Sequence, residues 1–238
     1  MVTRKKVIDA YDEARAFYDS GYKSNNKAYN EAFTLDGRRD QLVAATANSP
    51  RPLSADEATA RVAARHKNQG LSIPKAREIN TDRQSPLQIG AAYVRAANTA
   101  GNCGEMACVM MYFAEKHGIS SDEMWLATAT NSNTTHWSRG KMVFGHSWAQ
   151  LGSESKGLGL IMYADPWAGV CCLKSDYPRE LKLQLDKWQR QGKRVCMHWE
   201  RFDPVWTNAN DDAILSLVAT NASIVLRGAN VVGRSART

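Results

Sequence analysis

The sequence lacks the features that mark membrane-spanning and conventionally secreted proteins. Although 43% of its 238 residues are apolar, no uninterrupted apolar run approaches the roughly 18 residues that indicate a transmembrane helix. Residues 1–11 are rich in charge and have no apolar segment of the kind that signal peptides carry. We therefore expect no membrane span and no cleavable export signal, which favours the cytoplasm.

The sequence also has few features that would bind a metal, a nucleotide or nucleic acid. The five cysteines are an odd number, which argues against a disulfide framework. Cys171, Cys172, Cys196 and His198 are poorly spaced for one metal site, since adjacent strand residues point to opposite faces. The glycines form no phosphate-binding loop, and no acidic cluster suits calcium. We expect no metal and no cofactor.

A net charge of +7 at pH 7 favours acidic partners, nucleic acid or anionic membrane surfaces. The positive residues are nevertheless scattered, acidic residues interrupt them, and no basic stripe with interleaved aromatic residues is present. A solvated basic surface explains this charge, so we do not expect a nucleic-acid partner.

Hydrophobic periodicity predicts both helices and strands. Apolar residues at helical spacing predict helices at 1–20, 86–98 and 105–116, and Ser54 with Glu57 forms a capping-box pattern for another at 55–68. Further helices are expected at 179–191 and 211–226. Alternating segments predict strands at 124–130, 141–151, 159–164 and 170–173, with a hairpin connection at 153–157.

Three residues within this map suit thiol chemistry. Cys103 lies in Gly-Asn-Cys-Gly-Glu, at the start of the helix expected at 105–116, where unpaired N–H groups and a partial positive charge favour a thiolate and can hold an oxyanion. His146 lies in one predicted strand and Asp165 at the end of the next. If those strands pair through the hairpin, an imidazole held by a carboxylate can take the thiol proton.

This pattern resembles the transglutaminase-like branch of the papain-like thiol enzymes. Gly-x-Cys at a helix start, a His-x-Trp strand and an Asp-Pro strand end carry the resemblance, over roughly residues 100–170. The resemblance implies Cys103 as nucleophile, His146 as general base and acid, Asp165 as the group that orients the imidazole, and Trp148 as a neighbour of the site. The short interval from Cys103 to His146 is similar to that of bacterial toxin deamidases.

The resemblance implies an α+β fold with a papain/transglutaminase-like core, in which the catalytic helix packs on an antiparallel sheet with extra helices at both ends. We expect a helical N-terminal extension over residues 1–85 and a catalytic domain over 86–238. The backbone N–H of Cys103 is the expected first oxyanion donor. A second donor or pocket residue would be Gln88, Asn98 or Asn102.

The resemblance further implies an enzyme that acts on carboxamide or peptide bonds of a protein through an acyl-thioester. A bacterial effector that deamidates glutamine, or joins it to an amine as transglutaminases do, is favoured. This would make a host protein the substrate, and it adds delivery into a host cell by a specialised secretion system as a second expected location. Alternatives are a cysteine protease of the same fold and a non-catalytic binding protein on it. His136, in a polar segment before Trp137, competes with His146 for the catalytic role.

Overall fold

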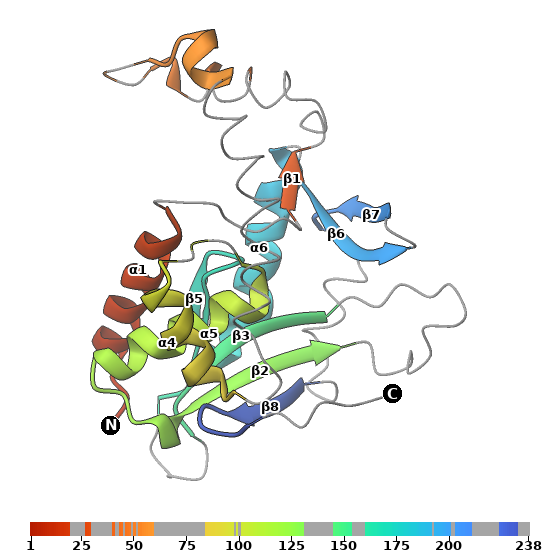
Figure 1. The fold of residues 1–238 in the computed structure, drawn as a ribbon. Helices are drawn as coiled ribbons and strands as arrows, with labels where there is room; N and C mark the ends of the chain where they lie inside the picture. The colour runs from red at the N-terminus through yellow and green to blue at the C-terminus, as the bar shows by residue number, and fades with distance from the viewer. Residues whose placement is uncertain are drawn as a thin grey trace.

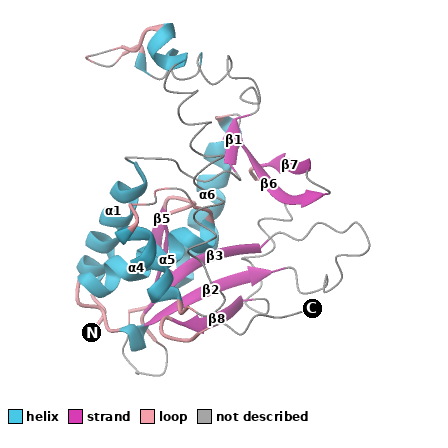
Figure 2. Ribbon diagram, in the orientation of Figure 1, coloured by secondary structure: helices cyan, strands magenta, loops and turns pink. Residues whose placement is uncertain are grey.

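A computed structural model of the chain describes residues 1–19, 27–29, 40, 43–44, 46–48, 50, 52–59, 84–97, 99, 101–130, 145–153, 160–191, 193–200, 203–210 and 224–232. Helices and antiparallel strands both form in this part of the chain, as Figures 1 and 2 show. The expected α+β class is confirmed.

A five-stranded antiparallel sheet forms the centre of the fold. Its strands lie in the order β5-β4-β3-β2-β8. The hairpin pairing expected between β3 and β4 is confirmed, since Ala149 lies opposite Ala164, although residues 154–159 of its connection lie outside the described part. The strands are β2 (Met124–Thr130), β3 (Gly145–Leu151), β4 (Met162–Asp165), β5 (Val170–Leu173) and β8 (Ile224–Gly228).

Three helices lie together against this sheet in Figure 1: α1 (Arg4–Asp19), α4 (Pro86–Arg95) and α5 (Cys103–Lys116). The central one is α5, which contacts β2, β3 and β4 and is covered by the other two. The backbones of α4 and α5 approach closely at Gly90, where a Cβ atom would lie 2.1 Å from the carbonyl oxygen of Cys108. Only glycine fits there without displacing one helix.

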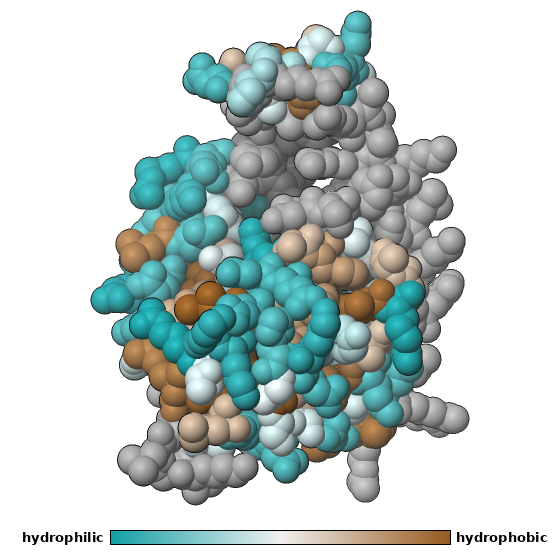
Figure 3. Space-filling view, turned by 90° about the vertical axis from the view of Figure 1, so that its left-hand side faces the viewer, coloured by the Kyte–Doolittle hydropathy of each residue, from teal (hydrophilic) through white to brown (hydrophobic). Residues whose placement is uncertain are grey.

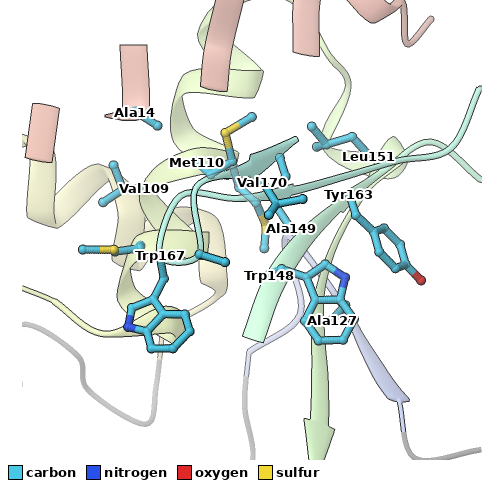
Figure 4. Packing of buried hydrophobic residues seen from close by; sticks show 14 of the residues in the cluster. Ala14, Val109, Met110, Ala127, Trp148, Ala149, Leu151, Tyr163, Trp167 and Val170 are labelled. Carbon is cyan, nitrogen blue, oxygen red and sulfur yellow. The ribbon is translucent and has the colours of Figure 1, made fainter. Parts of the chain in front are cut away.

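The core lies between α5 and the sheet. Figure 4 shows Met110 of α5 close to Ala149 and Val170, with Val109 and Ala14 farther toward the helices. These side chains are almost fully buried, and burying one large apolar side chain contributes roughly 1.5–3 kcal/mol. Because α5 is packed along its length, the position of its first residue is fixed relative to the sheet.

The C-terminal third of the sequence adds a helix and a second sheet. Helix α6 (Tyr177–Arg190), preceded by the short η4 (Lys174–Asp176), confirms the helix expected at 179–191. The second sheet has the order β1-β6-β7 and was not predicted. Its strands are β1 (Lys27–Tyr29), β6 (Lys193–Glu200) and β7 (Asp203–Asn208).

The helix expected at 211–226 is wrong where the structure describes it, because Ile224, Val225 and Leu226 lie in β8. Two of these three are β-branched, and β2 offers a partner strand, so tertiary pairing prevails over the helical spacing. Residues 211–223 lie outside the described part. The helix expected at 55–68 is helical at 55–59 and begins with the expected capping box, in which the Glu57 N–H donates to Ser54 Oγ at 3.2 Å.

The division of the chain at residue 85 stays a prediction, but α1 packs directly on the part assigned to the catalytic domain. Val7, Ala10 and Ala14 of α1 are fully buried. Glu13 forms ion pairs with Lys116 and His117 at the end of α5. Helix α1 is therefore part of the core, whatever the other N-terminal residues form.

Helix α1 lies on the left-hand side of Figure 1, and Figure 3 shows the molecule from that side. On this surface hydrophilic side chains predominate, and apolar side chains form small patches. None of the helices in the described ranges has the length and apolar character needed to cross a bilayer.

Candidate active site

Cys103 is the first residue of α5, and the local sequence explains why the helix starts there. Asn102 precedes it in an extended conformation, and its N–H donates to Glu105 Oε2 at 2.9 Å. Met106 N–H closes the first helical turn onto Asn102 O at 2.9 Å. The thiol therefore sits at the N-terminal tip of a helix whose later residues are buried, and it is itself half-buried.

His146 and Asp165 are brought together by the pairing of β3 with β4. His146 is the second residue of β3 and Asp165 the last of β4. The imidazole Nε2 lies 2.7 Å from Asp165 Oδ2. The side chains are 3% and 0% exposed, so this ion pair is shielded from water.

The Cys103 thiol reaches the start of β3, where His146 lies. Cys103 Sγ lies 4.0 Å from the carbonyl oxygen of Gly145, the residue before His146. The nearby Cys103 is one of the smaller influences that raise the pKa of His146. Since Nε2 is bonded to Asp165, Nδ1 is the ring nitrogen left to exchange a proton with the thiol.

Burial and pairing act on this imidazole in opposite directions. Burial by itself lowers the pKa of His146, but the charge and hydrogen bond of Asp165, with the smaller influence of Cys103, outweigh it and raise the pKa above its usual range. Burial likewise raises the pKa of Asp165, but His146 and hydrogen bonds from Ala168 and Tyr177 outweigh it and lower the pKa. The favoured state is therefore an imidazolium beside a carboxylate.

The Asp165 carboxylate also has partners outside the predicted set. The Ala168 N–H donates to Oδ1 at 2.9 Å, so Asp165 stabilises the turn that follows it. The Tyr177 hydroxyl donates to Oδ2 at 2.7 Å and lies 3.3 Å from His146 Nε2. Sequence reasoning missed Tyr177 because it begins α6, outside any motif, and no spacing rule links it to Asp165.

Aromatic rings enclose the imidazole. The ring centroid of Trp167 lies 4.9 Å from that of His146, and the centroid of Trp148 lies 5.6 Å from it. Both tryptophans are buried, and Figure 4 shows them among the core side chains. Trp148 therefore lies beside the site, and its ring helps to keep water away from the His146–Asp165 pair.

The other predicted site residues are placed differently. Asn102 adjoins Cys103 as the helix cap. Gln88 is exposed, and its described hydrogen bonds are those of a capping box with Ser85 at the start of α4, at 2.9 and 3.3 Å. Its side-chain carbonyl thus has a helix-capping role. Asn98 and His136 lie outside the described residues.

Cys108, Cys171 and Cys172 have a different environment from that of Cys103. Burial, the main cause in each case, raises the pKa of Cys108, Cys171 and Cys172 to about 12. Within the described residues, no three His, Cys, Asp or Glu side chains cluster as a metal site would require. Cys103 is thus distinguished from these three thiols by its place beside the start of β3, next to His146, and by its position at a helix tip.

Chemically, the arrangement provides a partly accessible sulfur, a base that can take its proton, and a buried anion that fixes the base. Helix geometry leaves N–H groups at the first turn of α5 without acceptors inside the helix, beside the sulfur. These are the parts that nucleophilic attack on a carbonyl carbon requires.

The chain was compared with models of protein families, with curated proteins and with solved structures. None of the three comparisons yields a match.

Proposed function

We propose that the protein is a thiol-dependent enzyme that acts on protein carboxamide bonds through an acyl-thioester on Cys103. The observation that carries the proposal is a half-buried thiol at the tip of α5 whose Sγ lies 4.0 Å from the carbonyl oxygen of Gly145, the residue before His146. The imidazole of His146 is in turn bonded to the buried Asp165 carboxylate. We also propose that α5 and the five-stranded sheet are a papain/transglutaminase-like core, since the helix tip and two paired strands supply the three groups.

In the first step, the Cys103 thiolate attacks the carbonyl carbon and a C–S bond forms. The carbonyl oxygen becomes an oxyanion, which the Cys103 N–H at the start of α5 can stabilise. The C–N bond then breaks, and the His146 imidazolium gives its Nδ1 proton to the leaving nitrogen. Ammonia departs if the substrate is a side-chain carboxamide.

In the second step, the now neutral imidazole takes a proton from water, and the resulting hydroxide attacks the thioester. A C–O bond forms, the C–S bond breaks, and the thiolate–imidazolium pair is restored. The net reaction exchanges NH₂ for OH, which converts glutamine to glutamate. Deamidation is favoured over peptide cleavage by the resemblance of the short Cys103–His146 interval to toxin deamidases.

The proposal is tested by incubating candidate substrate proteins with the enzyme and measuring their intact masses. Deamidation adds the mass difference between OH and NH₂, cleavage shortens the chain, and transfer joins an amine to it. The expected result is deamidation that disappears in Cys103→Ala. A shortened product would show that the enzyme cleaves peptide bonds through the same thioester mechanism instead of deamidating glutamine.

Cys108→Ala is the matched control, because Cys108 lies on the same helix but is buried in the core. It should keep its activity if it folds, which its thermal unfolding would show. Equal activity of Cys103→Ala and the wild type would overturn the proposal.

A further inference from the structure

Tyr177 contacts the His146–Asp165 pair from a third element, α6. Its hydroxyl lies 2.7 Å from Asp165 Oδ2 and 3.3 Å from His146 Nε2. The Tyr177 hydroxyl and the His146 imidazole therefore bind the same carboxylate oxygen. The ring is fully buried between Trp148 and Tyr163, at centroid distances of 5.0 and 5.2 Å. This packing leaves the hydroxyl little freedom to point elsewhere.

The hydroxyl is a donor in this contact. Burial and the charge of Asp165 raise the pKa of Tyr177 well above its ordinary value, so the phenol keeps its proton. The imidazole Nε2–H and the phenol O–H both donate to Oδ2, while the Ala168 N–H donates to Oδ1. The three described donors together hold both oxygens of the carboxylate.

We propose that Tyr177 is a positioning residue for the thiol reaction, whose hydroxyl holds Asp165 Oδ2 toward His146 Nε2 and stabilises the buried carboxylate when the imidazole is neutral. The proposal rests on the proposed function, in which His146 alternates between imidazolium and imidazole during each turnover.

The direction in which Tyr177 shifts the pKa of His146 follows from the alternation between imidazolium and imidazole. When His146 is an imidazolium, its charge stabilises Asp165 directly. When His146 has given up its proton, the remaining described donors to the carboxylate are the neutral Ala168 N–H and Tyr177 O–H, so the Tyr177 hydrogen bond matters more. Arg15 of α1 donates to Pro166 O, and burial raises the pKa of Tyr11 and of Cys172, which keeps both uncharged beside Asp165. Tyr177 therefore favours the neutral imidazole, and removal of its hydroxyl should make the imidazolium persist to higher pH.

The test is an NMR titration of ¹⁵N-histidine-labelled protein, with His146 assigned from its absence in His146→Gln. In Tyr177→Phe we expect the His146 titration midpoint to move to higher pH. Tyr163→Phe is the matched control, since it loses a phenol hydroxyl from the same aromatic cluster, and its midpoint should stay at the wild-type value. An unchanged or lowered midpoint in Tyr177→Phe would overturn the proposal.

A second measurement avoids any loss of packing. Incorporation of 3-fluorotyrosine at position 177 keeps the hydroxyl and makes it a stronger donor, so the His146 midpoint should move to lower pH. No movement, or movement upward, would count against the proposal even if Tyr177→Phe failed to fold.

The kinetic consequence is separable from the titration. In an active enzyme, Tyr177→Phe should lower kcat about tenfold, the effect of losing one hydrogen bond to a charged group, and should shift the basic limb of the kcat/KM profile to higher pH. If no carboxamide substrate is turned over, the proposed function fails while the NMR titration still decides the role of the Tyr177 hydroxyl.

Discussion

Replacing Asp165 by Asn should inactivate Cys103 by changing which nitrogen of His146 carries a proton. In the wild type, the three described partners of the carboxylate all donate: Ala168 N–H, Tyr177 O–H and His146 Nε2–H. An amide has only one acceptor oxygen. The Ala168 N–H is part of the backbone turn and cannot rotate, so the Asn oxygen should occupy the Oδ1 position and its NH₂ the Oδ2 position.

The imidazole must then adjust to a donor at the Oδ2 position. It can do so by becoming the Nδ1–H tautomer, in which Nε2 accepts from the amide. Nδ1 would then present a proton to the Cys103 thiol instead of a lone pair. A tautomer change of this kind lowers kcat by about 10⁴-fold in a Ser-His-Asp enzyme, roughly 5 kcal/mol of transition-state stabilisation, and we expect a loss of that order here.

The assay uses both turnover and alkylation, so that it does not depend on a known substrate. Iodoacetamide should label Cys103 rapidly at neutral pH in the wild type and slowly in Asp165→Asn, with the rate recovering only at alkaline pH. Asp186→Asn is the matched control, because Asp186 pairs with Lys182 on the surface of α6. Equal alkylation rates and pH profiles in Asp165→Asn and the wild type would refute the tautomer argument.

The same variant should change how stability depends on pH. Asp165 has a lowered pKa in the folded protein, so its contribution is present above the unfolded value of 3.8 and is lost as pH falls through the folded pKa. His146 has a raised pKa, so its contribution is present below 6.5 and is lost as pH rises through the folded pKa. Asp165→Asn should therefore lower the free energy of unfolding by its largest amount, about 1–3 kcal/mol, between pH 3.8 and pH 6.5. Urea unfolding at a series of pH values would measure this.

Three further predictions concern the thiols and the scaffold. Iodoacetamide at low dose should label Cys103 before Cys108, Cys171 and Cys172, whose raised pKa values of about 12 leave little thiolate; peptide mapping by mass spectrometry checks this, and equal rates at the four sites would contradict it. Gly90→Ala should destabilise the fold by about 1–3 kcal/mol, because its Cβ would lie 2.1 Å from Cys108 O; urea unfolding measures the loss, and Gly104→Ala, whose Cβ meets no atom within 4 Å, is the control. Deletion of residues 1–19 should abolish cooperative unfolding, because it exposes the core under Val7, Ala10 and Ala14; a truncated protein with the wild-type melting temperature would show that α1 is dispensable.

The parts of the fold that the sequence predicts well are those whose pattern is locally determined. Helix α5 is apolar nearly all round, and β2 and β5 have the predicted bounds. The pairing of β3 with β4 follows from a short connection, and it brings His146 to Asp165. Strands β6 and β8 pair with strands far away in the sequence, β1 for the first and β2 for the second, so local periodicity is a poor guide to them.

The residues of the candidate site also differ in how well the sequence predicts their contacts. Cys103, His146 and Asp165 occur in short motifs on elements with clear periodicity, so their proximity could be predicted. Tyr177 reaches Asp165, 12 residues earlier, only because α6 packs near the end of β4. Arg15 of α1 donates to Pro166 O at 2.8 Å across 151 residues of sequence. Neither contact has a local signal, since both depend on how helices dock onto the sheet.

The buried pair also bears on why these residues are present at all. Removing an imidazolium and a carboxylate from water costs several kcal/mol per ion, and apolar residues of similar volume in place of a buried pair often stabilise a protein. His146 lies against the rings of Trp148 and Trp167, and Asp165 against that of Tyr177, in a mainly apolar and aromatic core where such residues would pack. Stability therefore does not explain the pair. A chemical role does, because the half-buried Cys103 thiol at the helix tip needs a base held in one orientation to take its proton. This costly pair lies next to the Cys103 thiol and not beside Cys108, which is buried on the same helix. Its location favours a chemical role for all three groups.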